Sequence, residues 1–223
     1  MGVSTKKAVS LAKGGNISLV KAAADAGVPL QRIAVACGWD ANKNGLFSHD
    51  YDLDLTAAAL DASRLVPNQQ DPTDPGYQEW FIHANHRTPS GKSIRFMDDN
   101  RTGKGDGDDE TIKVDLPSVP SLIESITFAV VIWRAVERKQ KFGNVKNAFI
   151  RIYDETTGTE LTRFDIGPDF SEETLVAFGE LYRYKGEWKF RAIGQGYDTA
   201  NYRHQHNIAR AFETEYARPN YPN

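Results

Sequence analysis

Cysteine and long hydrophobic runs are nearly absent from this sequence, and both absences exclude classes of protein. Cys37 is the only cysteine among 223 residues, so the chain can form neither an internal disulfide nor a cysteine-based zinc site. The longest apolar stretch, from Phe128 to Trp133, has six residues, whereas a membrane-spanning helix needs about 20. The first 20 residues contain no apolar run of signal-peptide length. We therefore expect a cytoplasmic protein in a reducing environment.

An excess of basic charge is also lacking. The net charge is −3 and the sequence pI is about 6.0, which leaves no basic footprint for nucleic acid. The negative charge is concentrated in two segments, residues 40–54 with a net charge of −3 and residues 98–110 with −4. Such a concentration in a nearly neutral protein requires a physical reason, and cation binding is one.

Short alternating segments predict a mostly β fold. Ile33–Cys37 alternates, and the β-branched run 126–133 is typical of a central strand buried on both faces. Residues 149–166 and 175–193 each predict a hairpin around a turn. Many short strands separated by turns indicate a two-sheet β-sandwich.

The remaining segments suggest one main domain with an extension. Residues 1–198 are expected to form the sandwich, and 199–223 a C-terminal extension with a short helix from Thr199 to Tyr216. Residues 66–76 contain three prolines and no periodicity, which predicts a loop insertion.

The first acidic segment alternates strictly between aspartate and an apolar residue. In an extended chain Asp50, Asp52 and Asp54 share one face, with neighbouring carboxylates about 7 Å apart. At an effective dielectric near 20 each pair repels by roughly 2 kcal/mol, a cost that a divalent cation removes. A solvated acidic face explains this segment equally well when it is taken alone.

The second acidic segment, residues 98–110, places oxygen-bearing side chains among glycines. Calcium prefers six to eight oxygen ligands, and glycines let a loop turn its carbonyl groups inward. The spacing is close to an EF-hand loop, but Thr102 and Asp109 depart from that pattern and the flanks alternate like strands. A phosphate-binding loop is excluded because the aspartates would repel phosphate. We interpret the segment as a metal-binding loop between strands; a polar hairpin loop is the alternative.

Several motifs in order resemble the TerD-type tellurium-resistance and calcium-stress family over roughly residues 3–198. They are Lys13–Leu19, Gly38–Asp40, Asp50–Asp54, Asp99–Glu110, Phe142–Ala148, Gly158–Leu161, Phe178–Arg183 and Lys189–Tyr197. The resemblance implies a β-sandwich that holds calcium near one end, and a bacterial stress-response role linked to tellurite, other toxic agents and phage. The 66–76 insertion and the chain beyond Tyr197 depart from the family pattern.

From the residues and the resemblance together we expect a calcium-dependent interaction module rather than an enzyme. Two calcium ions are expected, with the ligands Asp40, Asp50, Asp52, Asp99, Asn100, Asp106, Asp108, Asp109 and Glu110. Asp54 is left out because it can point toward the following turn. The expected partners are other stress-response proteins, membrane-associated complexes or a second copy of the chain, and not nucleic acid. The alternative is a metal-dependent hydrolase that uses the same carboxylates.

Overall fold

The computed structural model describes residues 9–10, 16–19, 30–41, 49–64, 66–67, 80–88, 91–97, 99–105, 107–166 and 170–198. The predicted helix at Thr199–Tyr216 lies outside these residues, as do most of the 66–76 insertion and the predicted ligand Asp106.

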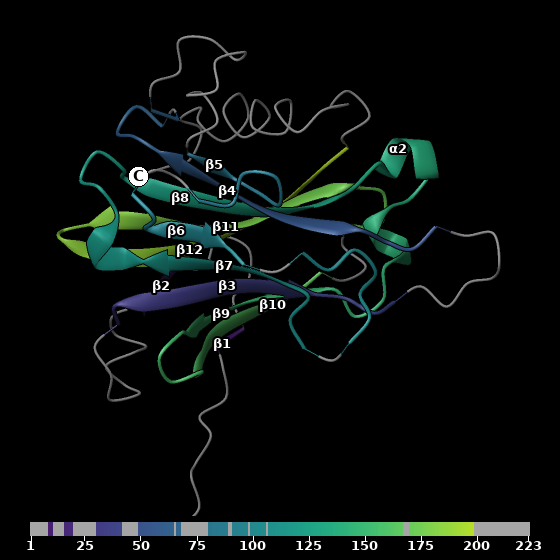
Figure 1. Cartoon of the computed structure of the whole chain (residues 1–223), viewed down its shortest axis with the longest axis horizontal. Coiled ribbons are helices and arrows are strands. Elements are labelled where there is room, and N and C mark those ends of the chain that lie inside the picture. Colours follow the sequence, from purple (N-terminus) through teal and green to yellow (C-terminus); the bar gives the residue numbers. More distant parts are fainter. Residues whose placement is uncertain are drawn as a thin grey trace, which may run out of the picture.

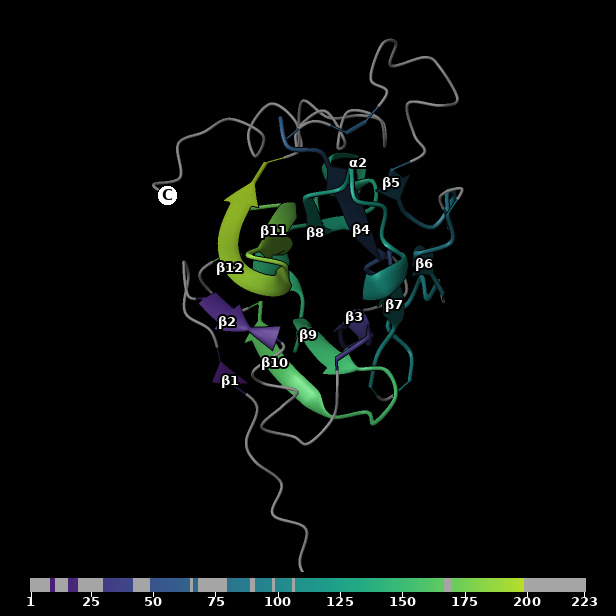
Figure 2. The ribbon, with the colours of Figure 1, turned by 90° about the vertical axis from the view of Figure 1, so that its left-hand side faces the viewer.

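Within the described residues two six-stranded sheets stack face to face (Figure 1). Sheet A has the order β1 (Val9–Ser10), β10 (Glu160–Asp165), β9 (Phe149–Asp154), β3 (Arg32–Gly38), β7 (Glu110–Asp115) and β6 (Ile94–Phe96). Sheet B has the order β2 (Asn16–Ser18), β12 (Glu187–Tyr197), β11 (Leu175–Tyr184), β8 (Ser125–Ile132), β4 (Leu53–Leu60) and β5 (Phe81–Ile82). Neighbouring strands are antiparallel except β1 and β10, which are parallel. Figure 2 shows the two layers from one end. The predicted two-sheet β-sandwich is confirmed.

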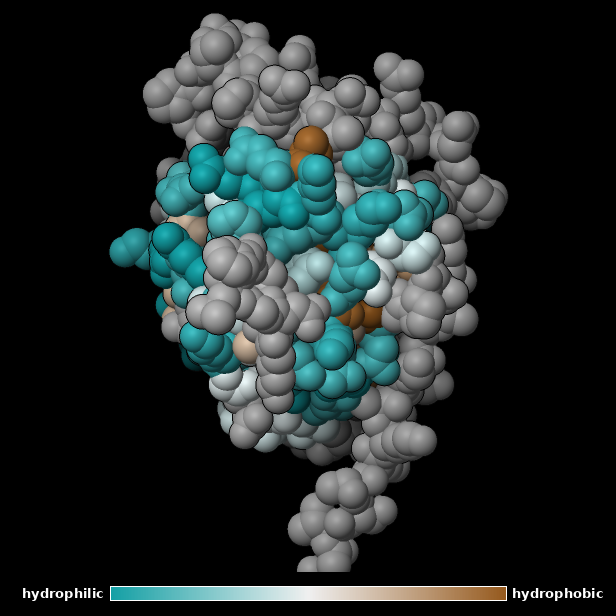
Figure 3. All heavy atoms as spheres, turned by 90° about the vertical axis from the view of Figure 1, so that its right-hand side faces the viewer, coloured by the Kyte–Doolittle hydropathy of each residue, from teal (hydrophilic) through white to brown (hydrophobic). Residues whose placement is uncertain are grey.

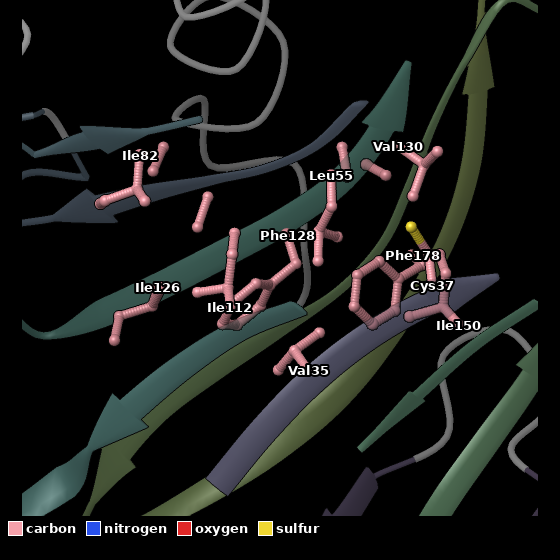
Figure 4. Packing of buried hydrophobic residues seen from close by; sticks show 14 of the residues in the cluster. Val35, Cys37, Leu55, Ile82, Ile112, Ile126, Phe128, Val130, Ile150 and Phe178 are labelled. Carbon is pink, nitrogen blue, oxygen red and sulfur yellow. The ribbon is translucent and has the colours of Figure 1, made fainter. Parts of the chain in front are cut away.

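The hydrophobic core fills the space between the sheets (Figure 4). Val35 and Cys37 of β3 face inward from sheet A, and Leu55 and Phe128 face inward from sheet B. All four side chains are buried. The alternation of these strands produces this core, because successive side chains point to opposite faces of a sheet.

Strand β8 is the central strand that its sequence predicts. It lies between β11 and β4, and all eight of its residues are buried. Strand β4 is buried along its whole length too, whereas β9 in sheet A alternates between buried and half-buried residues. Burial on both faces explains why β8 is continuously apolar or β-branched.

The end of the sandwich beyond β8 contains structure that the sequence does not predict. A four-residue helix, α2 (Ala135–Arg138), and the short 3₁₀ helix η3 (Phe142–Asn144) follow β8. The other 3₁₀ helix, η2 (Leu116–Ser118), follows β7. Ile132 pairs with Leu53, so α2 lies beside the start of β4. Figure 3 shows this end of the molecule, which is mostly hydrophilic. No helix in the described part of the chain is long and apolar enough to cross a membrane.

Candidate metal centre

Three acidic side chains from separate parts of the sequence meet at this end of the sandwich. Asp54 is the second residue of β4, Asp99 lies in the loop between β6 and β7, and Glu110 is the first residue of β7. One carboxylate oxygen from each lies within 4.8 Å of the others. Among the described residues this is the only such group of three or more histidine, cysteine, aspartate or glutamate side chains.

Glu110 brings the two sheets together at this point. Its side chain belongs to sheet A, but its Oε2 accepts the backbone N–H of Leu55 in sheet B at 2.5 Å. Among the described residues β5 pairs with β4 only at Ala57 and Ala58, so no strand there takes up the N–H of Leu55. The hydrogen bond therefore places the Glu110 carboxylate directly beside Asp54.

The cluster is buried, which makes its negative charge costly. Glu110 is 0% and Asp54 is 7% exposed. Burial, followed by the proximity of Asp54, raises the pKa of Glu110 to about 10. Burial, followed by the proximity of Asp52 and Asp99, raises the pKa of Asp54 to about 7. Without a cation, these acids cannot all be ionised at neutral pH.

Asp52 lies close enough for its charge to act on Asp54 and Glu110. Burial is the largest cause of its raised pKa, Arg138 opposes the shift, and Asp99 adds to it. In the described part of the chain, the ion pairs of the cluster are confined to Asp99. Arg101, with a 71% exposed side chain, pairs with Asp99 at 3.1 Å, and Arg87 lies 3.9 Å from the same carboxylate.

The residues present fit a bound cation. The Oε1 of Glu110 is buried and has no hydrogen-bond partner in the described part of the chain. A buried polar atom without a partner costs free energy, and a cation would satisfy it. The cluster offers only carboxylate oxygens, which suit hard cations such as calcium and magnesium better than zinc or copper. The cluster could therefore hold a metal ion.

The other side chains of the acidic loop build its framework. The Oδ2 of Asp109 accepts the backbone N–H of Trp39 at 2.8 Å, and its Oδ1 accepts the amide of Asn100. The Oδ1 of Asn100 accepts the N–H groups of Thr102 at 3.1 Å and of Gly103 at 3.2 Å. These bonds fold the loop back over Trp39.

Gly103 is required where the loop meets Trp39. Its φ is +61°, and a Cβ atom there would lie 2.5 Å from the Trp39 ring. Any other side chain would both strain the backbone and collide with the indole. The indole in turn donates from Nε1 to the carbonyl of Tyr51 at 3.1 Å. Trp39 thus connects the loop to the segment that precedes β4.

Three further predicted ligands, Asp40, Asp50 and Asp108, are not members of the cluster. Asp108 receives two hydrogen bonds from the guanidinium of Arg151, at 2.7 and 2.8 Å. The Oδ2 of Asp40 accepts the amide of Asn147 at 2.8 Å. Asp50 is fixed through its carbonyl oxygen, which accepts from Gln140 at 3.2 Å. Of the predicted ligands, the cluster brings together Asp99 and Glu110, with Asp52 beside them.

Asp54 is the cluster member that the predicted ligand set omits. The strict alternation of Asp50, Asp52 and Asp54 was the available indication, because it puts all three on one face. The sequence could not reveal that β4 begins only at Leu53, which carries Asp54 into the buried edge of the sheet.

The remaining candidates for metal or redox chemistry lie outside the cluster. Cys37 is 1% exposed, and burial followed by the charge of Glu110 raises its pKa well above its usual value. A thiol with a raised pKa is a poor nucleophile. His83 and His86 pair through their backbones at the turn after β5, and burial lowers the pKa of His83 to about 4.

Fold and site together define a class of protein: an antiparallel β-sandwich with a buried carboxylate cluster that could hold a metal ion. Residues 7–201 match the TerD domain family. The chain belongs to this family, as its sequence motifs predict.

Named relatives agree with this assignment. The chain is 46% identical over 189 residues to the tellurium resistance protein TerD of Serratia marcescens, covering 85% of this chain and 91% of the relative. It is 44% identical over 190 residues to general stress protein 16U of Bacillus subtilis (strain 168), with the same coverage. These relatives are named as resistance and stress proteins, not as enzymes.

Solved structures share the fold. A crystal structure described as the unknown function protein SAV2460 superposes with a TM-score of 0.60 at 26% identity, covering 78% of this chain and 95% of that one. A Streptomyces coelicolor A3(2) protein described as a homologue of telluride resistance protein (TerD) gives a TM-score of 0.60 at 20% identity, covering 76% and 91%. This second match supports the fold alone.

Proposed function

We propose that this protein is a calcium-binding, non-enzymatic member of the TerD family that acts as a calcium-dependent interaction module in a cytoplasmic stress response. The buried Oε1 of Glu110, which lacks a hydrogen-bond partner in the described residues, is the observation that carries the proposal. It belongs to an all-oxygen cluster with Asp54 and Asp99. Asp52 lies near enough for its charge to raise the pKa of Asp54 and of Glu110.

Calcium suits this cluster better than magnesium. Calcium takes six to eight oxygen ligands in flexible geometry, whereas magnesium demands near-ideal octahedral geometry and loses its water reluctantly. The Asp99 loop turns through glycines with positive φ, at Gly103, Gly105 and Gly107, and such a loop can supply backbone carbonyl groups. The names of the relatives support the stress-response setting.

The interaction role follows from the position of the cluster. A cation here would neutralise acids on both sheets and fix the loop and the start of β4 together, and a metal that orders loops can present a surface to partners. Other stress-response proteins, membrane-associated complexes and a second copy of the chain are the partners we propose. The net charge of −3 argues against nucleic acid.

Calorimetric titration of chelator-treated protein tests the metal. We expect calcium to bind with a defined stoichiometry and magnesium to bind more weakly. Glu110→Gln should remove binding at the cluster, because it replaces a buried ligand. Glu155→Gln is the matched control, since Glu155 pairs with Lys113 at 2.8 Å on the other sheet face and should leave calcium binding unchanged. Wild-type protein that takes up no calcium would refute the proposal.

A further inference from the structure

A flat band of small and apolar side chains lies on the outer face of sheet B, the face turned away from the core. Phe128 and Val130 of β8 point into the core, so Ala129 between them points outward (Figure 4). Its partners in register are Thr56 of β4 and Ala177 of β11, and such partners share a face of the sheet. Six residues form this outer band, and each is at most 4% exposed: Thr56, Ala58, Ala129, Val131, Leu175 and Ala177.

The described residues do not account for the burial of the outer band. Ala129 is 0% exposed, yet the four side chains around it on this face are alanine, threonine or valine, too short to lie over it. Within the described chain the main contacts of β8 are with β11 and β4, its neighbours in the same sheet. Ala36 on the outer face of sheet A differs, because it pairs with Arg151, whose long side chain can cover it.

The burial extends over only part of the outer face. Tyr184, at the far end of β11, points outward as well, and it is 45% exposed. Between Tyr184 and the outer band, Glu180 is fully buried and pairs with Arg64 at 2.8 Å. A face that is covered over part of its length fits a single segment of chain.

The chain itself supplies a segment that starts beside the outer band. Strand β12 ends at Tyr197, which pairs with Leu175 of the band, and residues 199–223 follow. The helix that the sequence predicts from Thr199 to Tyr216 would be about 27 Å long. Strands β4 and β8 have eight residues each, which corresponds to about 26 Å. Such a helix is therefore long enough to cover the band.

The sequence of this segment suits the outer band. Ile208, Phe212 and Tyr216 are four residues apart, so they share one face of a helix. The small side chains of the band leave room for large ones to pack against the sheet. Residues 68–79, which also lie outside the described residues, suit it less, because they have two prolines and Tyr77 is their only large apolar residue.

We propose that the segment after Asp198 docks on the outer band of its own chain through Ile208 and Phe212, and so blocks this face of sheet B to other proteins. The proposal does not depend on the calcium site. Residues 202–223 lie beyond the match to the TerD domain family, so most of the docking segment is an addition to that domain. A short linker keeps such an occupant at an effective concentration of about millimolar, and an unlinked partner competes poorly with it.

Thiol labelling of the full chain tests the docking. Ala129→Cys places a reporter in the outer band, and the native Cys37, which is 1% exposed, gives little background. A buried thiol reacts only when its cover opens, so we expect the reporter to react at least about tenfold faster when Phe212→Asp is added. Tyr221→Asp, beyond Pro219, is the matched control and should leave the rate unchanged. Tyr184→Cys, at an exposed position, should react fast in every chain.

Nuclear magnetic resonance gives a second measurement that leaves the outer band unchanged. In the full chain with ¹³C-labelled alanine methyl groups, we expect nuclear Overhauser effects between the methyl groups of Ala129 and Ala177 and the ring protons of Phe212. A mixture of deuterated chain carrying these methyl labels with unlabelled chain shows only contacts between two copies. We expect no such effects in the mixture.

The outcomes decide between the possible occupants. If Phe212→Asp leaves the labelling rate of the Ala129→Cys reporter unchanged and the Phe212 ring shows no contact with the band, the proposal is wrong. If labelling slows as the protein concentration rises, or the mixed sample shows the contacts, a second copy covers the face instead. Contacts from Tyr77 in place of Phe212 would assign the face to residues 68–79.

Discussion

Asp108 and Glu110 lie two residues apart in the same acidic loop and strand, yet they have opposite environments. Asp108 receives two hydrogen bonds from the guanidinium of Arg151, which balances its charge. Glu110 is fully buried, receives one backbone N–H, and has a second oxygen without a partner in the described residues. Burial raises the pKa of Glu110 to about 10.

This difference shows that the density of acids along the chain does not identify the metal ligands. A carboxylate that has both oxygens paired with a guanidinium, as Asp108 has with Arg151, gains little from a cation. Carboxylates that are buried and uncompensated gain the most, because a cation removes both their repulsion and their desolvation cost. We therefore expect metal-dependent effects to follow Glu110 and Asp54 rather than Asp108.

Thermal unfolding should give the largest effect. A ligand that binds only the folded state stabilises it by about 2.7 kcal/mol at one hundred times its dissociation constant. For a domain of this size that corresponds to a rise in Tm of roughly 5–10 °C on adding calcium to chelated protein. Asp54→Asn should lose most of this rise and should melt higher than wild type in chelator, since a buried charge has been removed.

Asp108→Asn is the contrasting variant in the same experiment. Removing its ion pair with Arg151 should lower Tm by a few degrees, as expected for the loss of about 1 kcal/mol. The decrease should be the same in calcium and in chelator, so that the calcium-induced rise stays intact. If Asp108→Asn lost the calcium-induced rise in Tm while Asp54→Asn kept it, Asp108 rather than Asp54 would be the ligand.

The pH dependence of calcium binding should give an intermediate effect. The raised pKa values of Asp54 and Glu110, about 7 and about 10, mean that the metal-free cluster holds protons at neutral pH. Calcium must displace them, so its affinity should rise by about tenfold or more from pH 6 to pH 7. Calorimetry in two buffers with different ionisation enthalpies measures the released protons, and binding without proton release would contradict the raised pKa values.

The same pKa values set the stability of the chelated protein. An acid whose pKa is higher in the folded than in the unfolded state binds protons more tightly when folded. This contribution to stability is complete below the unfolded pKa, near 4, and is lost as pH rises through about 7 for Asp54 and about 10 for Glu110. Calcium should therefore stabilise the protein more at pH 8 than at pH 5.

The smallest effect should come from Arg101. Its exposed guanidinium pairs with Asp99, where it competes with a cation for the same carboxylate. Arg101→Met should raise calcium affinity by about two- to threefold at low salt, because exposed ion pairs are weak and screened. Arg163→Met, which removes an exposed pair with Asp165, is the control and should leave the affinity unchanged. A lower calcium affinity in Arg101→Met would show that Arg101 supports the site.

Periodicity predicted most of the sandwich because it reports directly which face of a strand is buried. The central position of β8 and the hairpin of β9 and β10 both follow from such patterns. The helix α2 was not predicted, since four residues carry no helical period. It is flanked by Arg134 and Lys139, both in left-handed backbone conformation, and neither residue type indicates such a conformation.

The site was harder to predict than the fold. The sequence located both acidic segments, and the structure brings Asp54 together with Asp99 and Glu110. The sequence could not show which acids of a segment would be ligands, because that depends on which hydrogen-bond donors face each acid in the folded chain. Arg151 hydrogen-bonds Asp108 across 43 residues of the chain, and Asn147 donates to Asp40 across 107 residues. Which donor meets which acid therefore depends on how the strands are aligned in the sheets.

The hydrogen bond from Leu55 to Glu110 also joins the two sheets mechanically. Among the described residues β5 pairs with β4 only at Ala57 and Ala58, and the Glu110 carboxylate satisfies the N–H of Leu55 in place of a strand. Both residues are 0% exposed, so a small residue at position 110 would leave a buried donor without an acceptor, at a cost of about 1–3 kcal/mol even in buffers that contain no metal. The junction of the sheets and metal binding thus depend on opposite oxygens of one side chain.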